Sequence, residues 1–205
     1  MVINFSKAFD LIPHDKLLAK IEATGVDLRV VVWVKVFLLG RWQRVRINGQ
    51  ISEEVRVNFG VQQGSRLGPL IYVPYVKDIW RNNESNIWLF ADDCIIYKKI
   101  MNISDIDMLQ MDQNSLGEWA VENEMVVYPG KSKAVSFTKD GVKERTRYYF
   151  GDQLIAEVST FKYLGIIIGS KLTWSDHVNY TLRNAWKALH FIMHTLKWEI
   201  IIRNV

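Results

Sequence analysis

The sequence predicts a mixed α+β fold, and three observations lead to that prediction. The chain has 205 residues, of which 49% are hydrophobic and 23% charged; this is enough apolar material for one core, or a core with a small appendage, and it excludes the disordered class. Segments with the two-residue period of strands are interleaved with segments of helical period. No internal repeat or low-complexity linker separates them, which favours a single α+β organisation.

The first forty residues predict a short buried strand followed by two helices. Residues 2–5 form the apolar strand, and the helical spacing of Leu17, Leu18 and Ile21 predicts a helix over 15–23. Asp27 is a suitable N-cap for a second helix that runs through Leu39 and ends at Gly40. Because most positions of this second helix are apolar, we expect it to be largely buried.

A hairpin and a third helix follow. Residues 43–47 and 52–57 alternate in polarity and flank Asn48-Gly49, the dipeptide preferred in type I′ turns because both residues tolerate positive φ. Beyond a glycine-punctuated loop, a helix is expected over 69–80. Pro74 lies inside this helix and should kink it, because proline lacks the N–H that the previous turn would bond.

The second half predicts two strands around an acidic turn, a long helix, further strands and a final helix. The two strands are 87–90 and 94–97, and the amphipathic helix covers 105–123. The remaining elements are strands at 126–128, 134–137, 147–150, 153–155 and 161–168, and a helix from Trp174.

Composition limits the partners and the location of the protein. The formal net charge is +4 and the pI about 9.1, with a local excess of lysine and arginine over 131–147, which fits a nucleic-acid partner without requiring one. Cys94 is the only cysteine, so no internal disulfide is possible. The apolar runs are too short to span a bilayer, and no signal peptide is visible. We expect a nuclear or cytoplasmic protein that is neither secreted nor membrane-embedded.

The sharpest local feature is the pair Asp92-Asp93 between two apolar strands. Adjacent carboxylates at a hairpin tip can hold a hard cation through oxygen. Aspartate is also a common turn residue, and for this pair alone a solvated surface turn is the better interpretation.

Several sequence blocks that follow one another along the chain favour a metal site at this pair over a plain surface turn. In order they are Asn4–Asp10 with Pro13-His14, Gly60–Leu70, Tyr75–Ile79, Phe90–Asp93, Trp119 with Lys131–Lys133, and Lys162–Gly165 with Leu172, Trp174 and His177. Together they resemble the motifs of reverse transcriptases from non-LTR, LINE-like retrotransposons. Each block singly is weak, but the ordered series covers nearly the whole chain and is specific.

The resemblance implies a fold and an activity. It implies a polymerase palm, an antiparallel sheet with helices packed on one face, over 1–145, a primer-grip-like β region over 146–168, and a partial helical thumb over 169–205. The fingers are missing, so we expect a fragment. The implied activity is RNA-directed DNA synthesis, in which dNTPs are added to a DNA primer 3′-hydroxyl on an RNA template. Two Mg²⁺ ions, or Mn²⁺, serve as cofactors. The sequence leaves the oligomeric state open.

The resemblance also assigns roles to individual residues. The catalytic and metal-binding positions are Asp92, Asp93 and Asn4, and the substrate-binding positions are Phe9, Gln63, Gly64, Ser65 and Lys131. Phe9 would exclude a 2′-hydroxyl, and Lys131 would lie near the nucleotide phosphates. Each also has a plainer interpretation: core packing for Phe9, a turn for Gly64, and a solvated charge for Lys131.

Asn4 is the main departure from the family pattern, which has an aspartate there. An amide oxygen can bind Mg²⁺, but it carries no charge and bridges two cations poorly. We therefore expect an impaired polymerase. The alternatives are a non-catalytic nucleic-acid-binding remnant of the same fold, to which Arg41, Arg44 or Arg46 could contribute phosphate contacts, and an unrelated α+β domain, which the ordered motifs disfavour.

Overall fold

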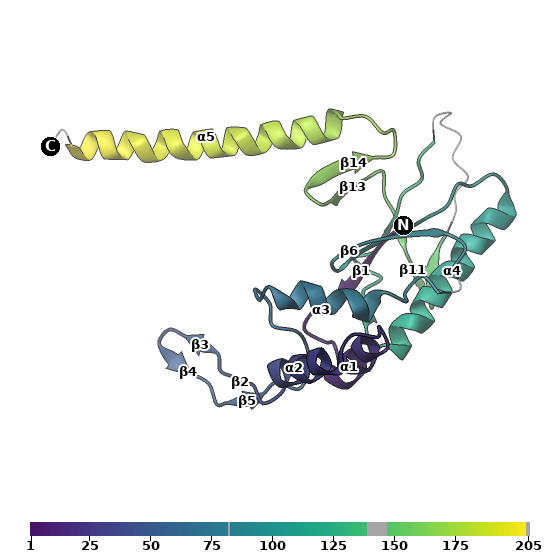
Figure 1. Cartoon of the computed structure of the whole chain (residues 1–205). Helices are drawn as coiled ribbons and strands as arrows, with labels where there is room; N and C mark the ends of the chain where they lie inside the picture. Colours follow the sequence, from purple (N-terminus) through teal and green to yellow (C-terminus); the bar gives the residue numbers. More distant parts are fainter. Residues whose placement is uncertain (82, 139–146, 204–205) are drawn as a thin grey trace. The chain divides into compact units, whose positions relative to one another are not determined.

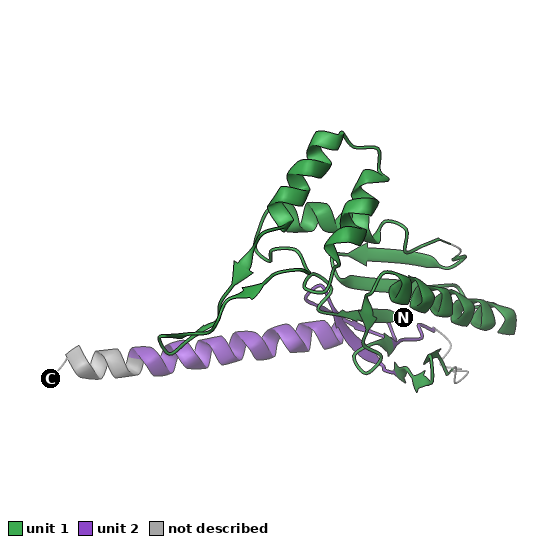
Figure 2. Cartoon of the chain, turned by 90° about the horizontal axis from the view of Figure 1, so that it is seen from below, with its two compact units in different colours: residues 1–133, 146–156 green, residues 134–145, 157–205 purple. Residues whose placement is uncertain are grey.

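The computed structural model describes residues 1–81, 83–138 and 147–203, with side chains to 196. It confirms a mixed fold of helices and antiparallel strands (Figure 1). The chain divides into two compact units: unit 1 is 1–133 with 146–156, and unit 2 is 134–145 with 157–205 (Figure 2).

The core of unit 1 is built on an antiparallel sheet. Its strands are β1 (Val2–Ser6), β6 (Asn86–Phe90), β7 (Asp93–Tyr97), β8 (Val126–Val127) and β9 (Lys133–Ala134). The order is β9-β1-β7-β6, and β8 also pairs with β1. Ile3 lies opposite Cys94, and both are fully buried. Because side chains alternate across a strand, one face of the sheet is the core face, while Trp88 on the other face is 64% exposed.

Helices cover the core face. They are α1 (His14–Glu22), α3 (Leu67–Val76) and α4 (Ile103–Glu122), and α2 (Leu28–Leu38) packs against α1. The indole of Trp119 in α4 meets the ring of Phe5 edge-on, with the ring centroids 6.4 Å apart. A capping box between Asn102 and Asp105 fixes the start of α4.

A half-buried ion pair ties three helical segments together. The Nζ of Lys20 in α1 donates to Oδ1 of Asp78 at 2.7 Å and to the carbonyl of Tyr75 at 2.8 Å. The indole N–H of Trp119 donates to the same carboxylate oxygen at 3.0 Å. Partial burial acts to raise the pKa of Asp78, but these hydrogen bonds and the Lys20 charge outweigh it and hold the pKa below its usual value.

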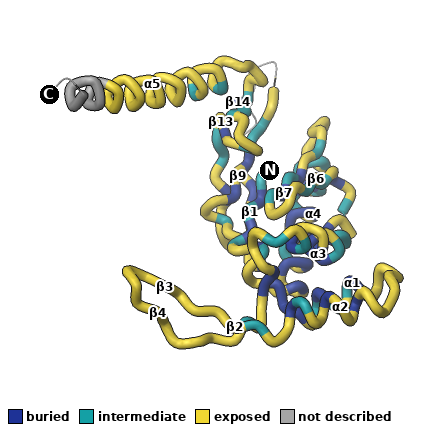
Figure 3. The backbone as a smooth tube through the Cα atoms, turned by 60° about the vertical axis from the view of Figure 1, so that its left-hand side comes forward, coloured by how far each residue is buried: buried dark blue, intermediate teal, exposed yellow. Residues whose placement is uncertain are grey.

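A narrow arm follows α2. It consists of β2 (Trp42–Gln43) paired with β5 (Val55–Arg56), and β3 (Arg46–Ile47) paired with β4 (Gln50–Ile51). Asn48 and Gly49 both have positive φ, 50° and 84°, so the predicted turn is confirmed. Every strand residue of the arm is exposed (Figure 3).

The last part of unit 1 is a small hairpin of β10 (Tyr149–Phe150) and β11 (Gln153–Leu154). The side-chain amide of Gln113 in α4 donates to the carbonyl of Tyr149 at 2.7 Å. Strand β12 (Ala156–Glu157) follows at the boundary of the two units.

Unit 2 contains β13 (Thr160–Tyr163), β14 (Ile166–Gly169) and α5 (Ser175–Arg203). The prediction of one strand over 161–168 was wrong: Leu164 and Gly165 have φ of 45° and 86° and turn the chain into a hairpin. The amide of Ile167 donates to Nδ1 of His177 at 3.3 Å, which joins β14 to the first turn of α5.

Two further expectations about helices need correction. Helix α2 is not largely buried: it contacts α1 along one stripe, so Val36 is 71% exposed and Trp33 53%. Helix α3 ends at Val76, before the predicted Trp80. Within the described residues, no helix is both long and apolar enough to cross a membrane.

Candidate active site

Asp92 and Asp93 occupy different positions in the hairpin of β6 and β7. Phe90 pairs with Asp93, so only Ala91 and Asp92 form the loop. Asp93 is the first residue of β7. Ala91 has a φ of 53°, a left-handed conformation that disfavours a residue with a Cβ. Asp92 is thus held on a strained tip, and Asp93 is held on the sheet.

Asn4 lies directly across from Asp93 in the antiparallel pairing of β1 with β7. Directly opposite residues point to the same face, with Cβ atoms about 4.5–5.5 Å apart. Both side chains are partly exposed on the face away from the helices. The structure therefore brings the predicted metal-binding position of the first motif next to that of the third.

The backbone of Asn4 is fixed from the other side by the loop after β8. The amide of Asn4 donates to the Oγ of Ser132 at 3.1 Å, and the amide of Tyr128 donates to the carbonyl of Asn4 at 2.8 Å. Ser132 is fully buried and its hydroxyl also donates to the carbonyl of Tyr128. The sequence Lys131–Lys133 gave no indication of this role of Ser132, because a hydrogen bond between segments 128 residues apart leaves no local pattern.

The negative charge of Asp92 affects the ionisation of two neighbouring groups. Partial burial raises the pKa of Asp93, and the negative charge of Asp92 raises it further. The pKa of the Tyr72 phenol is raised by burial and then by Asp92. Asp92 therefore lies near both groups, and a bound cation would relieve the repulsion between the two carboxylates.

Phe9 stacks on Tyr72, with the ring centroids 4.3 Å apart and the planes at 28°. Phe9 is half-buried, whereas Tyr72 is only 2% exposed. The Phe9 ring therefore packs against the buried tyrosine whose pKa Asp92 raises. This position is compatible with core packing and with contact to a nucleotide sugar. Exclusion of a 2′-hydroxyl by Phe9 therefore stays a prediction.

The glycine-rich loop is attached to the first motif. The amide of Val61 donates to the carbonyl of Phe9 at 2.8 Å, and the imidazole Nε2 of His14 is 2.8 Å from the carbonyl of Gly60. Gly60 has a φ of +77°, and a Cβ there would come within 2.6 Å of the carbonyl oxygen of Asp10. Gly60 is therefore required by this close contact, which the sequence motif alone did not show.

The three predicted residues of the loop differ in what they contact. Gln63 and Gly64 are exposed, and Gly64 has a φ of +84° with no heavy atom within 4 Å of where a Cβ would be. The Ser65 hydroxyl donates to the carbonyl of Gln62 at 2.8 Å and accepts from the amide of Gly68 at 2.9 Å. Ser65 thus already stabilises the start of α3, and contact with a nucleotide stays a prediction for all three.

Lys131 belongs to the loop that holds Asn4. Its Nζ lies 5.2 Å from the centre of the Tyr128 ring, and its side chain is exposed. Because Tyr128 is hydrogen-bonded to Asn4, Lys131 extends from the same framework as the acidic site. A contact of Lys131 with a nucleotide phosphate stays a prediction.

The donor set at this site consists of the Asp92 and Asp93 carboxylates and the Asn4 amide. These are hard oxygen donors, which fit Mg²⁺ or Mn²⁺. No three His, Cys, Asp or Glu side chains gather as metal ligands in the part of the chain that the structure describes.

The meeting of these motifs around one antiparallel sheet is the arrangement expected of a polymerase, and sequence comparison agrees. Residues 1–168 match the family described as reverse transcriptase (RNA-dependent DNA polymerase), and the chain belongs to this family.

Its relatives are polymerases of mobile elements. The chain is 32% identical to the probable RNA-directed DNA polymerase from transposon X-element of Drosophila melanogaster, over 100% of this chain and 23% of that protein. It is 26% identical to the RNA-directed DNA polymerase from mobile element jockey of Drosophila funebris, over 98% of this chain and 22% of that protein. The resemblance to LINE-like retrotransposon reverse transcriptases is thereby confirmed, and the chain spans less than a quarter of the length of these curated relatives.

Proposed function

We propose that this chain carries the nucleotidyl-transfer site of an RNA-directed DNA polymerase, weakened by the asparagine at position 4. The observation that carries the proposal is the register that sets Asn4 opposite Asp93, next to Asp92 on the hairpin tip. Two polymerase motifs that lie far apart in sequence meet at this point.

In this proposal Asp92, Asp93 and the Asn4 amide hold divalent Mg²⁺ or Mn²⁺. The metal supplies activation of the primer 3′-hydroxyl and stabilisation of the charge on the leaving pyrophosphate. Phe9, supported by Tyr72, packs beneath the sugar of the incoming dNTP and excludes a 2′-hydroxyl. Lys131 attracts the triphosphate.

The remaining chain supports the substrates. Gly64 allows close approach of the template and nucleotide because nothing fills the space beside its Cα. The partners are then an RNA template, a DNA primer and dNTPs. We assign the sheet and its helices to the palm, β13 and β14 to a primer-grip-like hairpin, and α5 to the thumb.

Weak activity follows from the charge at position 4. An amide brings no negative charge to the site. Only two carboxylates therefore offset the charge of the two divalent cations. We expect the rate to be lower by roughly 10²–10³, the factor known for the loss of one group that stabilises the charge of a transition state.

Primer extension on an RNA template tests the proposal. We expect template-directed DNA product from the Asn4→Asp variant in Mg²⁺ or Mn²⁺, and none from Asn4→Asp combined with Asp92→Ala. Product from the Asp92→Ala combination at an unchanged rate would place the chemistry elsewhere. Strand binding without product in every variant would favour the second candidate, a non-catalytic nucleic-acid-binding remnant. The exposed basic and aromatic side chains of the arm support this candidate.

A further inference from the structure

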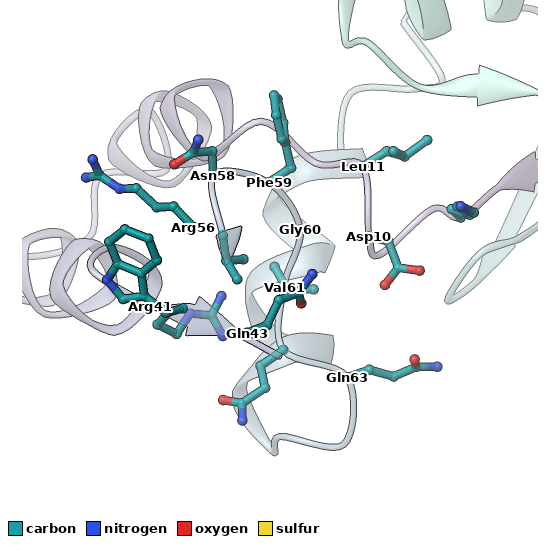
Figure 4. Close-up of a pocket in the computed structure, with 14 residues that line it drawn as sticks. Asp10, Leu11, Arg41, Gln43, Arg56, Asn58, Phe59, Gly60, Val61 and Gln63 are labelled. Carbon is teal, nitrogen blue, oxygen red and sulfur yellow. The ribbon is translucent and has the colours of Figure 1, made fainter. Parts of the chain in front are cut away.

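Two hollows of unit 1 differ in charge. The hollow at the base of the arm is lined by Arg41 and Arg56 with one carboxylate, Asp10 (Figure 4), and it borders the glycine-rich loop of the candidate active site. The second hollow lies between α4 and the hairpin of β10 and β11, and no lysine or arginine lines it in the described part of the chain. Its volume is about 850 Å³, within the range of about 300–1,000 Å³ common for ligand sites.

The second hollow is acidic. Glu118 and Glu122, one turn apart on α4, line it together with Asp152 from the β10–β11 turn, and all three side chains are exposed. None of the three carboxylates has an ion pair among the residues that the structure describes. Lys16 donates to the backbone carbonyl of Glu122, but its ion pair is with Glu124. Because like charges one turn apart on a helix repel, a cation bound beside them would be stabilising.

A buried side chain at this hollow has an acceptor without a donor. Gln113 lines the hollow and is 0% exposed. Its Nε2 donates to the carbonyl of Tyr149 at 2.7 Å, which fixes the orientation of the amide, because a carbonyl accepts from the amide nitrogen and not from the amide oxygen. The Oε1 of Gln113 is then left without a hydrogen-bond partner in the described part of the chain. An unpaired buried acceptor is unfavourable, and an N–H donor that enters the hollow would satisfy it.

Apolar surface lies beside these acceptors. The ring of Phe150 is partly exposed and lies close against α4, since a Cβ at Gly117 would come within 3.2 Å of its Cε1. Val121 also lines the hollow and is 78% exposed. A planar guanidinium can stack on an aromatic ring while it forms two hydrogen bonds with a carboxylate. The aliphatic part of an arginine side chain can meanwhile pack on valine.

We propose that this hollow binds a basic, arginine-containing peptide segment of a partner protein. A guanidinium pairs with Glu118 and Asp152, stacks on Phe150 and directs an N–H towards Gln113. A peptide is favoured over a metal ion, because no three His, Cys, Asp or Glu side chains gather as metal ligands within the described residues. It is favoured over a nucleic acid because the carboxylates repel phosphates. Since the chain carries a net charge of +4, the hollow is a local acidic site that would orient a basic partner.

The peptide site is separate from the proposed polymerase function. Helix α4 lies on the core face of the sheet, where Trp119 meets Phe5. Asn4 and Asp93 are partly exposed on the other face. A bound peptide would therefore leave the acidic hairpin free, and the two activities can be measured on the same chain.

Fluorescence anisotropy with a short labelled peptide of alternating arginine, leucine and glycine tests the site on the full chain. Glu118→Gln and Asp152→Asn should each weaken binding roughly tenfold through loss of a charged hydrogen-bond acceptor. The same peptide with citrulline in place of arginine keeps the shape without the charge and should bind weaker by tenfold or more, roughly. Phe150→Leu should lower the preference for the arginine peptide over a lysine peptide by about threefold, because a lost ring removes guanidinium stacking.

A matched control separates the site from a general charge effect. Asp107 is an exposed carboxylate of α4 that does not line the hollow. Asp107→Asn changes the net charge of the chain as much as Asp152→Asn does, and it should bind the arginine peptide as the wild type does. Circular dichroism melting shows that each variant is folded.

Three outcomes overturn the inference. They are no binding of the arginine peptide by the wild-type chain, binding by Glu118→Gln and Asp152→Asn that equals binding by Asp107→Asn, and competition by spermine as effective as that by the unlabelled peptide. The last outcome would make the hollow a site for small polyamines. Weaker binding in Glu118→Gln and Asp152→Asn alone would support the inference, whether or not Asn4→Asp yields product in primer extension.

Discussion

Replacement of Gly60 by alanine tests whether the glycine-rich loop is held against the first motif. A Cβ at position 60 would lie 2.6 Å from the carbonyl oxygen of Asp10 and 2.9 Å from its carbonyl carbon and Cα. These are backbone atoms, so no side-chain rotation can relieve the clash. The loop or the first motif must move.

Gly64→Ala is the matched control. Both glycines have positive φ, +77° for Gly60 and +84° for Gly64, so both substitutions carry the left-handed penalty of about 1–2 kcal/mol. Both also reduce the entropy of the unfolded chain equally. Only Gly60→Ala adds the steric term, about 1–3 kcal/mol for overpacking, and the difference between the variants isolates it.

Urea unfolding at equilibrium measures this difference. Gly60→Ala should be less stable than Gly64→Ala by about 1–3 kcal/mol, with the same dependence on urea, and should melt lower by roughly 2–4 °C for each kcal/mol. If the two variants unfold within about 0.5 kcal/mol of each other, the close contact of Gly60 with Asp10 is wrong, and with it the placement of the loop beside Phe9.

Three further predictions concern charged residues. Asp78→Asn should destabilise the chain at pH 7 by about 1–3 kcal/mol; because the folded pKa of Asp78 is depressed, the difference should be full above about pH 4 and vanish as pH falls through the folded pKa, as pH-dependent urea unfolding would show. Asp93→Asn should raise the melting temperature at pH 7, since the folded pKa of Asp93 is raised and ionisation disfavours folding; the gain should fade below about pH 4, where the carboxyl is protonated in both states. Lys131→Ala in the Asn4→Asp background should raise the dNTP concentration for half-maximal extension while changing stability by less than about 0.5 kcal/mol, because the contact of Lys131 with Tyr128 is exposed.

Local sequence signals predicted the elements whose geometry is set by neighbouring residues. Asn48-Gly49 specified its hairpin because both residues accept positive φ, and Asp27 caps α2 by accepting from the amide of Arg29. The hairpin at Leu164-Gly165 was missed because a leucine at positive φ is unusual and the apolar residues on either side resemble one continuous strand.

Contacts between segments that are far apart in the sequence could not be predicted from such local signals. The apolar sequence of α2 predicted burial, but burial depends on how many neighbours surround a helix. The attachment of Asn4 to Ser132 and of Gly60 to the first motif likewise depends on chain packing. The family motifs predicted which residues belong to one site, whereas the register of β1 on β7 shows which of them are adjacent.

The most direct test of the account is the affinity of the chain for Mn²⁺, measured by isothermal titration in a double-mutant cycle of Asn4→Asp and Asp93→Asn. Because these positions face each other across one strand pair, the third carboxylate should tighten Mn²⁺ binding by tenfold or more, roughly, through added ligand charge. In the Asp93→Asn background most of that gain should disappear. An equal gain with and without Asp93, or no gain from Asn4→Asp at all, would contradict the claim that these residues form one cation site.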